Sequence, residues 1–253
     1  MISRREIGPV RLHIYPDYET LSRAAAELFA TRSAEAVKLH GRFSVALSGG
    51  SGPVGFYELL ARAPYRERVD WKKVHFFWGD ERCVPEDDPR SNARLARRAF
   101  LASVPVPEDQ VHPIRCHDAP ASAAESYETL LKSYCRGCLH TFDLAIMGMG
   151  EDGHTASLFP GDPALMEQER WAVAVYKADE DLYRVTLTTP VFNRSETVLF
   201  LVAGREKARA LQEVLEGPYD PQRLPAQSIR PVSGELLWLV DEAAAELVSE
   251  LRL

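Results

Sequence analysis

Short apolar runs alternate with amphipathic stretches along this chain, and this alternation limits its fold more than any other feature. The runs Phe43–Leu47, Val74–Trp78 and 142–147 are apolar at most successive positions rather than at every second one. Such runs are typical of parallel strands that are buried on both faces of a sheet. The stretches between them have helical spacing. The pattern therefore predicts an α/β fold with a mainly parallel sheet that helices cover on both faces.

The remaining elements continue this pattern. Further strands are predicted at residues 10–15, 172–176, 183–188, 197–202 and 236–240. Six helices are also predicted. The first runs from its N-cap Asp17 to about Leu39, the second begins after Pro53, and the third, which is basic, ends at Phe100. The others cover residues 119–136, begin near Arg205, and cover residues 241–251. Residues 79–92 are predicted to form a polar loop. No repeat, low-complexity tract or convincing linker divides the chain, so residues 1–253 are predicted to form a single domain.

Charge and hydropathy narrow the classes of partner. The net charge of −7 disfavours bulk attraction to nucleic acid or to anionic lipid, so an anionic substrate needs local cations and backbone N–H groups. No apolar window approaches 18 residues, and no apolar segment follows the N-terminal arginines. We therefore expect no membrane span, no signal peptide and a cytoplasmic location.

The four cysteines suit a reducing compartment, because a chain of this length would need more for a disulfide framework. Cys135 and Cys138 form a C-x-x-C pair with His140 close behind. A zinc site would normally need a second pair at matching spacing, and the chain has none. Incidental reduced thiols are therefore favoured over a metal or redox role for Cys135 and Cys138.

A glycine-rich segment follows the strand Phe43–Leu47. Ligands of open α/β sheets bind beyond the carboxyl ends of the strands. The residues of this segment that are expected to bind substrate are Gly49, Gly50, Ser51 and Gly52. Glycines allow close approach of a ligand, and the start of the next helix presents N–H groups to an anion. The segment is neither a P-loop nor G-x-G-x-x-G, so a phosphate cradle and a plain strand-to-helix turn both stay open.

Charged residues follow the strand Val74–Trp78. Asp80, Glu81 and Arg82 come directly after a buried strand. They suit hydrogen bonds to sugar hydroxyls, or one carboxylate could act as a base. A solvated charged loop is an equally good interpretation of the same residues.

A third loop, residues 148–161, follows the strand at 142–147 and presents Asp152 and His154 two residues apart. Histidine titrates near neutrality and can accept a proton from water, and a nearby carboxylate can orient its ring. Further along, Lys207 is expected in the first turn of a helix, where a local anion would offset the unfavourable dipole. An ordinary exposed lysine is the alternative, and spacing alone says nothing about Arg184.

These residues together resemble the 6-phosphogluconolactonase family. The matching segments are 47–51, 79–82, 84–85, 91–92, 148–161 and 184–188, in an order that spans residues 10 to 250. The resemblance implies a Rossmann-like fold shared with glucosamine-6-phosphate deaminases and ribose-5-phosphate isomerases. It also implies hydrolysis of 6-phospho-D-glucono-1,5-lactone to 6-phospho-D-gluconate in the oxidative pentose phosphate pathway, without metal or organic cofactor.

The resemblance also implies roles for particular residues. The segment Gly49–Gly52 with Arg184 and Lys207 corresponds to the phosphate site of the family, and His154 corresponds to its base. We hypothesise that Asp152 orients His154 and that Arg82 or a backbone N–H stabilises the oxyanion. Where the family usually has threonine before proline, this chain has Gly52, which removes a hydroxyl that could donate to phosphate.

Two other functions compete with the lactonase. Deaminases of the same fold carry a glutamate five residues beyond the histidine, where this chain has Phe159. A sensor of sugar phosphates without turnover would need no Asp152–His154 pair and would usually carry a further domain. The expected partner is a small-molecule substrate, and the chain is expected to act as a monomer or a homodimer.

Overall fold

The computed structural model describes residues 3–7, 10–116 and 119–249. Its strands are β1 (Ser3–Ile7), β2 (Val10–Tyr15), β3 (Phe43–Leu47), β4 (Val74–Trp78), β5 (Asp80–Arg82), β6 (Leu144–Met147), β7 (Ala172–Lys177), β8 (Leu182–Leu187), β9 (Thr197–Val202) and β10 (Glu235–Asp241). Its helices are α1 (Tyr18–His40), α2 (Val54–Leu60), α3 (Tyr65–Arg68), α4 (Asn92–Ala99), α5 (Pro120–Tyr134), α6 (Thr189–Asn193) and α7 (Ala208–Glu216), with short 3₁₀ turns that include η5 (Arg205–Lys207).

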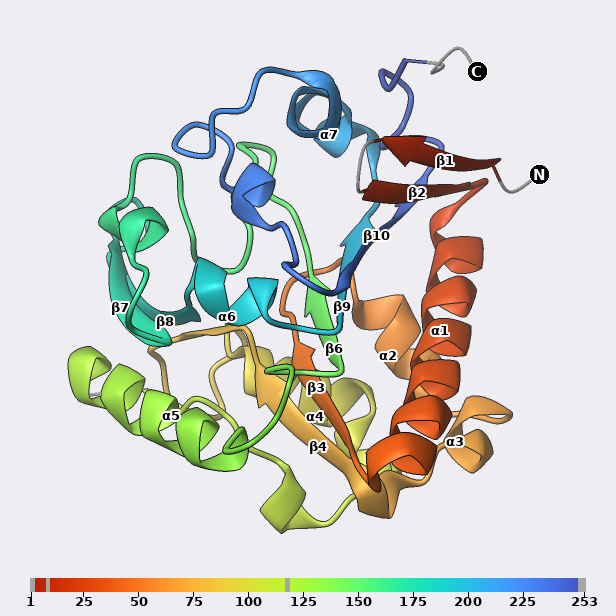
Figure 1. Cartoon of the computed structure of the whole chain (residues 1–253), viewed down its shortest axis with the longest axis vertical. Coiled ribbons are helices and arrows are strands. Elements are labelled where there is room, and N and C mark those ends of the chain that lie inside the picture. Colours follow the sequence, from red (N-terminus) through yellow and green to blue (C-terminus); the bar gives the residue numbers. More distant parts are fainter. Residues whose placement is uncertain (1–2, 8–9, 117–118, 250–253) are drawn as a thin grey trace.

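Within these residues, a seven-stranded sheet has the order β1-β2-β10-β9-β6-β3-β4 (Figure 1). Every neighbouring pair is parallel except β1 with β2. The carboxyl ends of β3, β6 and β9 therefore meet at one edge, which is where ligands of open α/β sheets bind. The predicted mainly parallel α/β fold is confirmed.

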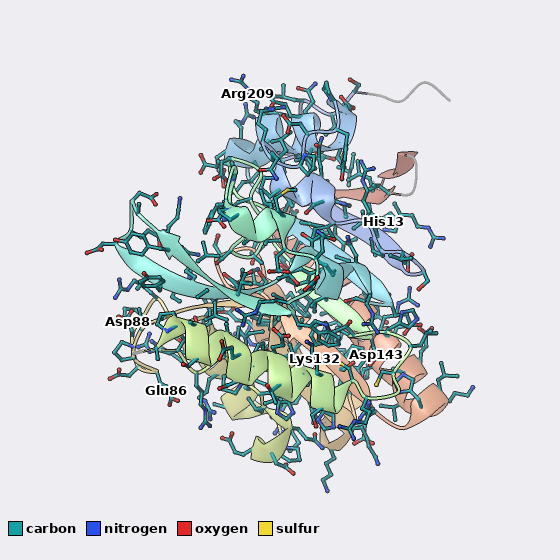
Figure 2. The ribbon with its side chains drawn as sticks, turned by 60° about the vertical axis from the view of Figure 1, so that its left-hand side comes forward. His13, Glu86, Asp88, Lys132, Asp143 and Arg209 are labelled. Atoms are coloured by element: carbon teal, nitrogen blue, oxygen red, sulfur yellow. A yellow bond between two sulfur atoms is a disulfide. The ribbon has the colours of Figure 1, made fainter. Side chains whose placement is uncertain are left out.

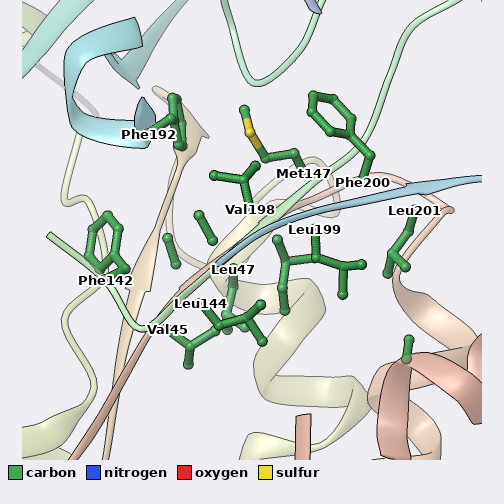
Figure 3. Close-up of a cluster of buried hydrophobic side chains, with 14 of the residues drawn as sticks. Val45, Leu47, Phe142, Leu144, Met147, Phe192, Val198, Leu199, Phe200 and Leu201 are labelled. Carbon is green, nitrogen blue, oxygen red and sulfur yellow. The ribbon is translucent and has the colours of Figure 1, made fainter. Parts of the chain in front are cut away.

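Helices cover both faces of the large sheet. On one face Phe76 of β4 stacks against Phe29 of α1, and on the other face Phe77 meets Tyr134 of α5 edge-on. Val198 and Phe200 of β9 likewise project opposite to Leu199 and Leu201 (Figure 3). All six residues of β9 are buried, which explains why its sequence is apolar from Val198 to Val202 rather than alternating.

A separate three-stranded antiparallel sheet has the order β5-β8-β7 and lies to one side of the large sheet (Figure 1). Its short strand β5 falls inside residues 79–92, which were predicted to be loop. Asp80 pairs with Thr186 and Arg82 pairs with Arg184 across β5 and β8. The second sheet therefore brings residues about 100 positions apart in the sequence to the same edge as the glycine-rich segment.

Most helix boundaries agree with the prediction. Asp17 caps α1, since its side chain accepts a hydrogen bond from the Thr20 N–H at 2.7 Å. The predicted helix over 241–251 is wrong, because residues 242–247 form turns after β10, and Leu251 lies outside the described residues. In the described ranges no helix is both long and apolar enough to cross a bilayer.

The cysteines follow the prediction for one pair and not for the other. Cys135 and Cys138 are free, as predicted. Cys83 and Cys116 form a disulfide, because the fold brings their Cα atoms to 4.6 Å although 33 positions separate them. The prediction of reduced thiols is therefore wrong for this pair, and the cysteines do not by themselves support a cytoplasmic location.

Candidate active site

A cleft with about 760 Å³ of empty volume, part of it open to solvent, lies at the carboxyl ends of β3, β6 and β9. The predicted site residues that line it are Gly49, Gly50, Ser51, Gly52, Asp80, Arg82, His154, Arg184 and Lys207. Glu81 and Asp152 are the two predicted residues that do not line it. Segments from five parts of the chain thus converge on one cavity.

The glycine-rich segment is held by a tyrosine of α1. The Tyr18 hydroxyl lies within hydrogen-bond distance of the Ser51 and Gly52 carbonyls and accepts the Gly55 N–H at 2.7 Å. A Cβ at Gly49 would fall 1.8 Å from Oδ1 of Asn92, so only glycine fits there. In the described chain, the N–H groups of residues 49–52 donate to no other group. They remain available to an anion in the cleft.

His154 and Asp152 form a close pair in the turn after β6. Nδ1 of His154 lies 2.6 Å from Oδ1 of Asp152, and the His154 backbone N–H donates to the same oxygen at 3.0 Å. The hydrogen bond from the His154 side chain lowers the pKa of Asp152 to about 2, so this carboxylate is ionised at neutral pH. The ionised Asp152 carboxylate therefore holds the His154 ring in a fixed orientation.

A glycine makes room for this pair. A Cβ at Gly150 would fall 2.1 Å from Nδ1 of His154 and 2.6 Å from Oδ1 of Asp152. Gly150 also accepts the Gly153 N–H, and it donates to the His154 carbonyl at 2.8 Å. The glycines of this loop therefore allow the histidine to fold back over its own turn and face the cleft.

Arg184 is buried at the wall of the cleft beside a carboxylate. Its Nη2 donates to both carboxylate oxygens of Glu180 at 2.6 and 2.7 Å, and its Nη1 lies 3.9 Å from Oδ2 of Asp80. Its Nε is buried and has no hydrogen-bond partner among the residues that the structure describes. The guanidinium also lies over the ring of Phe159, 5.4 Å from the centroid. Arg184 is thus a fixed cation, since it is only 7% exposed.

Arg82 and Asn92 lie side by side in the cleft. Nη1 of Arg82 donates to Oδ1 of Asn92 at 2.8 Å, and Nδ2 of Asn92 donates to the Asp80 carbonyl at 2.9 Å. Asp80 in turn accepts a hydrogen bond from the buried Ser157 hydroxyl at 2.6 Å. These contacts join β5, α4 and the loop that carries His154. Sequence reasoning did not assign Asn92 or Ser157 to the site, although both lie in the motifs that carry the family resemblance.

Glu81 has a different environment from its neighbours. Its carboxylate is buried and accepts hydrogen bonds from the N–H groups of Arg82, Asn92 and Ala93 and from the Ser91 hydroxyl. Burial raises the pKa of Glu81 to about 7, and these N–H donors oppose the rise. This geometry favours a role inside the protein over the predicted contact with substrate.

Lys207 ends the turn η5 and lines the same cavity. No ion pair to its ammonium group is formed within the described residues. Over the same ranges, 3–7, 10–116 and 119–249, no three His, Cys, Asp or Glu side chains are grouped to hold a metal ion. The cationic side chains that line the cleft are Arg82, Arg184 and Lys207.

Comparison with known proteins places the chain in a family. Residues 16–238 match the model for glucosamine-6-phosphate isomerases/6-phosphogluconolactonase. The chain belongs to this family. It is 42% identical to a 6-phosphogluconolactonase of Synechocystis, covering 90% of this chain and 94% of that protein. It is 40% identical to a 6-phosphogluconolactonase of Nostoc, over 93% and 98% of the two chains.

Solved structures of the isomerase/lactonase family have the same fold. The 6-phosphogluconolactonase from Trypanosoma cruzi superposes with a TM-score of 0.83 at 27% identity, covering 98% of this chain and 99% of that one. A monomeric glucosamine-6-phosphate deaminase superposes with a TM-score of 0.80 at 22% identity, over 93% and 99% of the chains. The fold is therefore shared by both activities, and the site residues must distinguish them.

Proposed function

We propose that the protein hydrolyses 6-phospho-D-glucono-1,5-lactone to 6-phospho-D-gluconate. The observation that carries the proposal is His154, which Asp152 holds and which faces a cleft lined by three cationic side chains and by residues 49–52, whose N–H groups have no partner in the described chain. The cleft offers a proton acceptor at one point and anion-binding groups at others, as a phosphorylated lactone requires. The relatives that carry the name 6-phosphogluconolactonase give the proposal independent support.

In this proposal the phosphate docks on the N–H groups of residues 49–52, with Lys207 and Arg184 as counter-charges. Binding at the phosphate, far from the reacting carbon, fixes the lactone carbonyl next to His154. Asp80 would then face the sugar hydroxyls at the cleft wall. Gly52 supplies only backbone to this phosphate site, in contrast to the threonine usual in the family.

For the chemical step, water attacks the lactone carbonyl carbon while the imidazole of His154 takes one of its protons. Asp152 holds Nδ1, which leaves Nε2 as the accepting atom. The tetrahedral oxyanion is stabilised by Arg82 or a backbone N–H, and it then collapses with cleavage of the ring C–O bond. The ring oxygen leaves as a hydroxyl after it takes the proton back from His154. Such a base is worth about 10² to 10⁴ in rate, and one oxyanion donor about 10² to 10³.

The deaminase alternative is disfavoured by Phe159. Its ring packs against His154 with 4.9 Å between centroids, at the place where a deaminase carries a glutamate. A phenyl ring cannot exchange a proton, so the ring-opening step of a deaminase has no acid there. Release of ammonia from glucosamine 6-phosphate would contradict this assignment.

Acid release from freshly generated phosphogluconolactone tests the proposal. We expect turnover well above spontaneous hydrolysis, and we expect His154→Ala to lower kcat by about 10²-fold or more. His40→Ala is the matched control, because His40 pairs with Asp143 at the end of α1 and lies outside the cleft. Phosphogluconate binding without turnover by the wild-type protein would indicate a sensor. Wild-type turnover in His154→Ala would remove the base assignment while leaving the lactonase intact.

A further inference from the structure

We propose that Glu81 is a positioning residue, which sets the cleft side chains of Arg82 and Asn92 by binding the backbone N–H groups of those residues. This inference rests on the proposed function for its activity readout. It replaces the predicted contact between Glu81 and substrate.

The first step is that the Glu81 carboxylate is fully occupied. Oε1 accepts from the N–H groups of Arg82 and Asn92, both at 2.7 Å. Oε2 accepts from the Ala93 N–H at 2.8 Å and from the Ser91 hydroxyl at 3.1 Å. A carboxylate offers about four lone-pair positions, so no acceptor position is left for a sugar hydroxyl. Glu81 is only 3% exposed and does not line the cleft.

The second step is that these donors belong to the residues that face the cleft. The same Glu81 oxygen binds the backbone of Arg82 in β5 and the backbone of Asn92, the first residue of α4. The side chains of Arg82 and Asn92 then bond to each other at 2.8 Å. A second bond runs from Arg82 Nη1 to the Arg90 carbonyl, also at 2.8 Å. Movement of α4 relative to β5 would therefore shift the guanidinium in the cleft.

The third step is that Glu81 costs stability where it stands. A buried charge is expensive even when it is well hydrogen-bonded, and the desolvation of this carboxylate outweighs its N–H donors and raises its pKa. Burial of Glu81 costs folding free energy, and its hydrogen bonds fix two side chains of the cleft. This combination is better explained by a role in function than by a role in stabilising the fold.

A double-mutant cycle on activity tests the inference. Glu81→Gln keeps the shape of the side chain but turns an NH₂ group toward backbone N–H donors. We expect it to lower kcat/KM about tenfold in the wild-type background and less than about twofold in the Arg82→Ala background. Glu86→Gln is the matched control, since Glu86 is exposed in the same β5–α4 loop at the periphery of the molecule and should change nothing (Figure 2). An equal loss in both backgrounds would overturn the inference in favour of a purely structural role.

Two further measurements keep the inference falsifiable. If Glu81→Gln does not fold, Ser91→Ala removes one of the four donors, and a smaller loss that again disappears with Arg82→Ala is expected. A crystal structure of unliganded Glu81→Gln does not depend on the reaction. We expect the bond from Arg82 to Asn92 to be broken in it, and an intact bond would refute the inference. Absence of wild-type turnover in the lactone assay would instead count against the proposed function alone.

Discussion

Replacement of Gly150 by alanine tests the geometry of the His154–Asp152 pair directly. The added Cβ would lie 2.1 Å from Nδ1 of His154, whereas ordinary van der Waals contact begins at 3.4 Å. The ring must therefore retreat by about 1 Å, and a misplacement of that size can cost about 10² in rate. The backbone at Gly150 does not have positive φ, so the change introduces overlap without backbone strain.

We expect Gly150→Ala to lower kcat about 10²-fold and to leave KM within about threefold, because the phosphate-binding groups lie elsewhere in the cleft. Overpacking of this kind costs about 1 to 3 kcal/mol of folding free energy, so kcat is measured well below the thermal midpoint. The assay is acid release from the lactone, corrected for spontaneous hydrolysis. Gly148→Ala is the matched control in the same loop, because its Cβ would meet only Oγ of Ser48, at 3.9 Å.

The reasoning fails if folded Gly150→Ala keeps the wild-type kcat. That result would mean that neither the position of the His154 ring nor its contact with Asp152 limits the reaction. Equal losses in Gly148→Ala and Gly150→Ala would point instead to general disturbance of the loop.

Three further predictions concern stability and phosphate binding. Reduction of the Cys83–Cys116 disulfide, or Cys116→Ser, should lower the free energy of unfolding by about 4 kcal/mol, because the bridge closes a loop of 33 residues. An unchanged thermal midpoint would contradict this prediction. Gly52→Thr should lower KM about tenfold, because it adds a hydroxyl donor for phosphate. The added Cβ would lie 3.3 Å from the Leu201 carbonyl oxygen, so a raised KM would mean that the threonine side chain does not fit there. The folded-state pKa of Glu81 is raised, so the native state keeps a proton that the unfolded chain releases between about pH 4.5 and 7. Wild-type unfolding free energy should therefore fall by about 3 kcal/mol relative to Glu81→Gln as pH rises through this window, and parallel denaturation curves at pH 5 and 8 would refute it.

The sequence by itself determined the large sheet and the centre of the candidate site. Strands such as Phe43–Leu47 are apolar at every position but one, and only burial on both faces explains that. Asp152 and His154 stand two residues apart in a glycine-rich loop, so their contact needs only the local chain. Features with short-range causes were therefore predictable from the order of residues.

The small sheet and its consequences were decided by tertiary structure. The strand Asp80–Arg82 consists of charged residues, which are uncommon in strands, and only its pairing with Leu182–Leu187 makes it one. Contacts between this strand and the start of α4 then bury Glu81 away from the cleft and place Arg82 beside Asn92. The local sequence predicts neither the disulfide nor these contacts. Each of them joins separate segments, and the number of residues between two segments does not give their distance in space. Periodicity and short spacing are properties of the chain, whereas long-range pairing depends on how all the strands pack together.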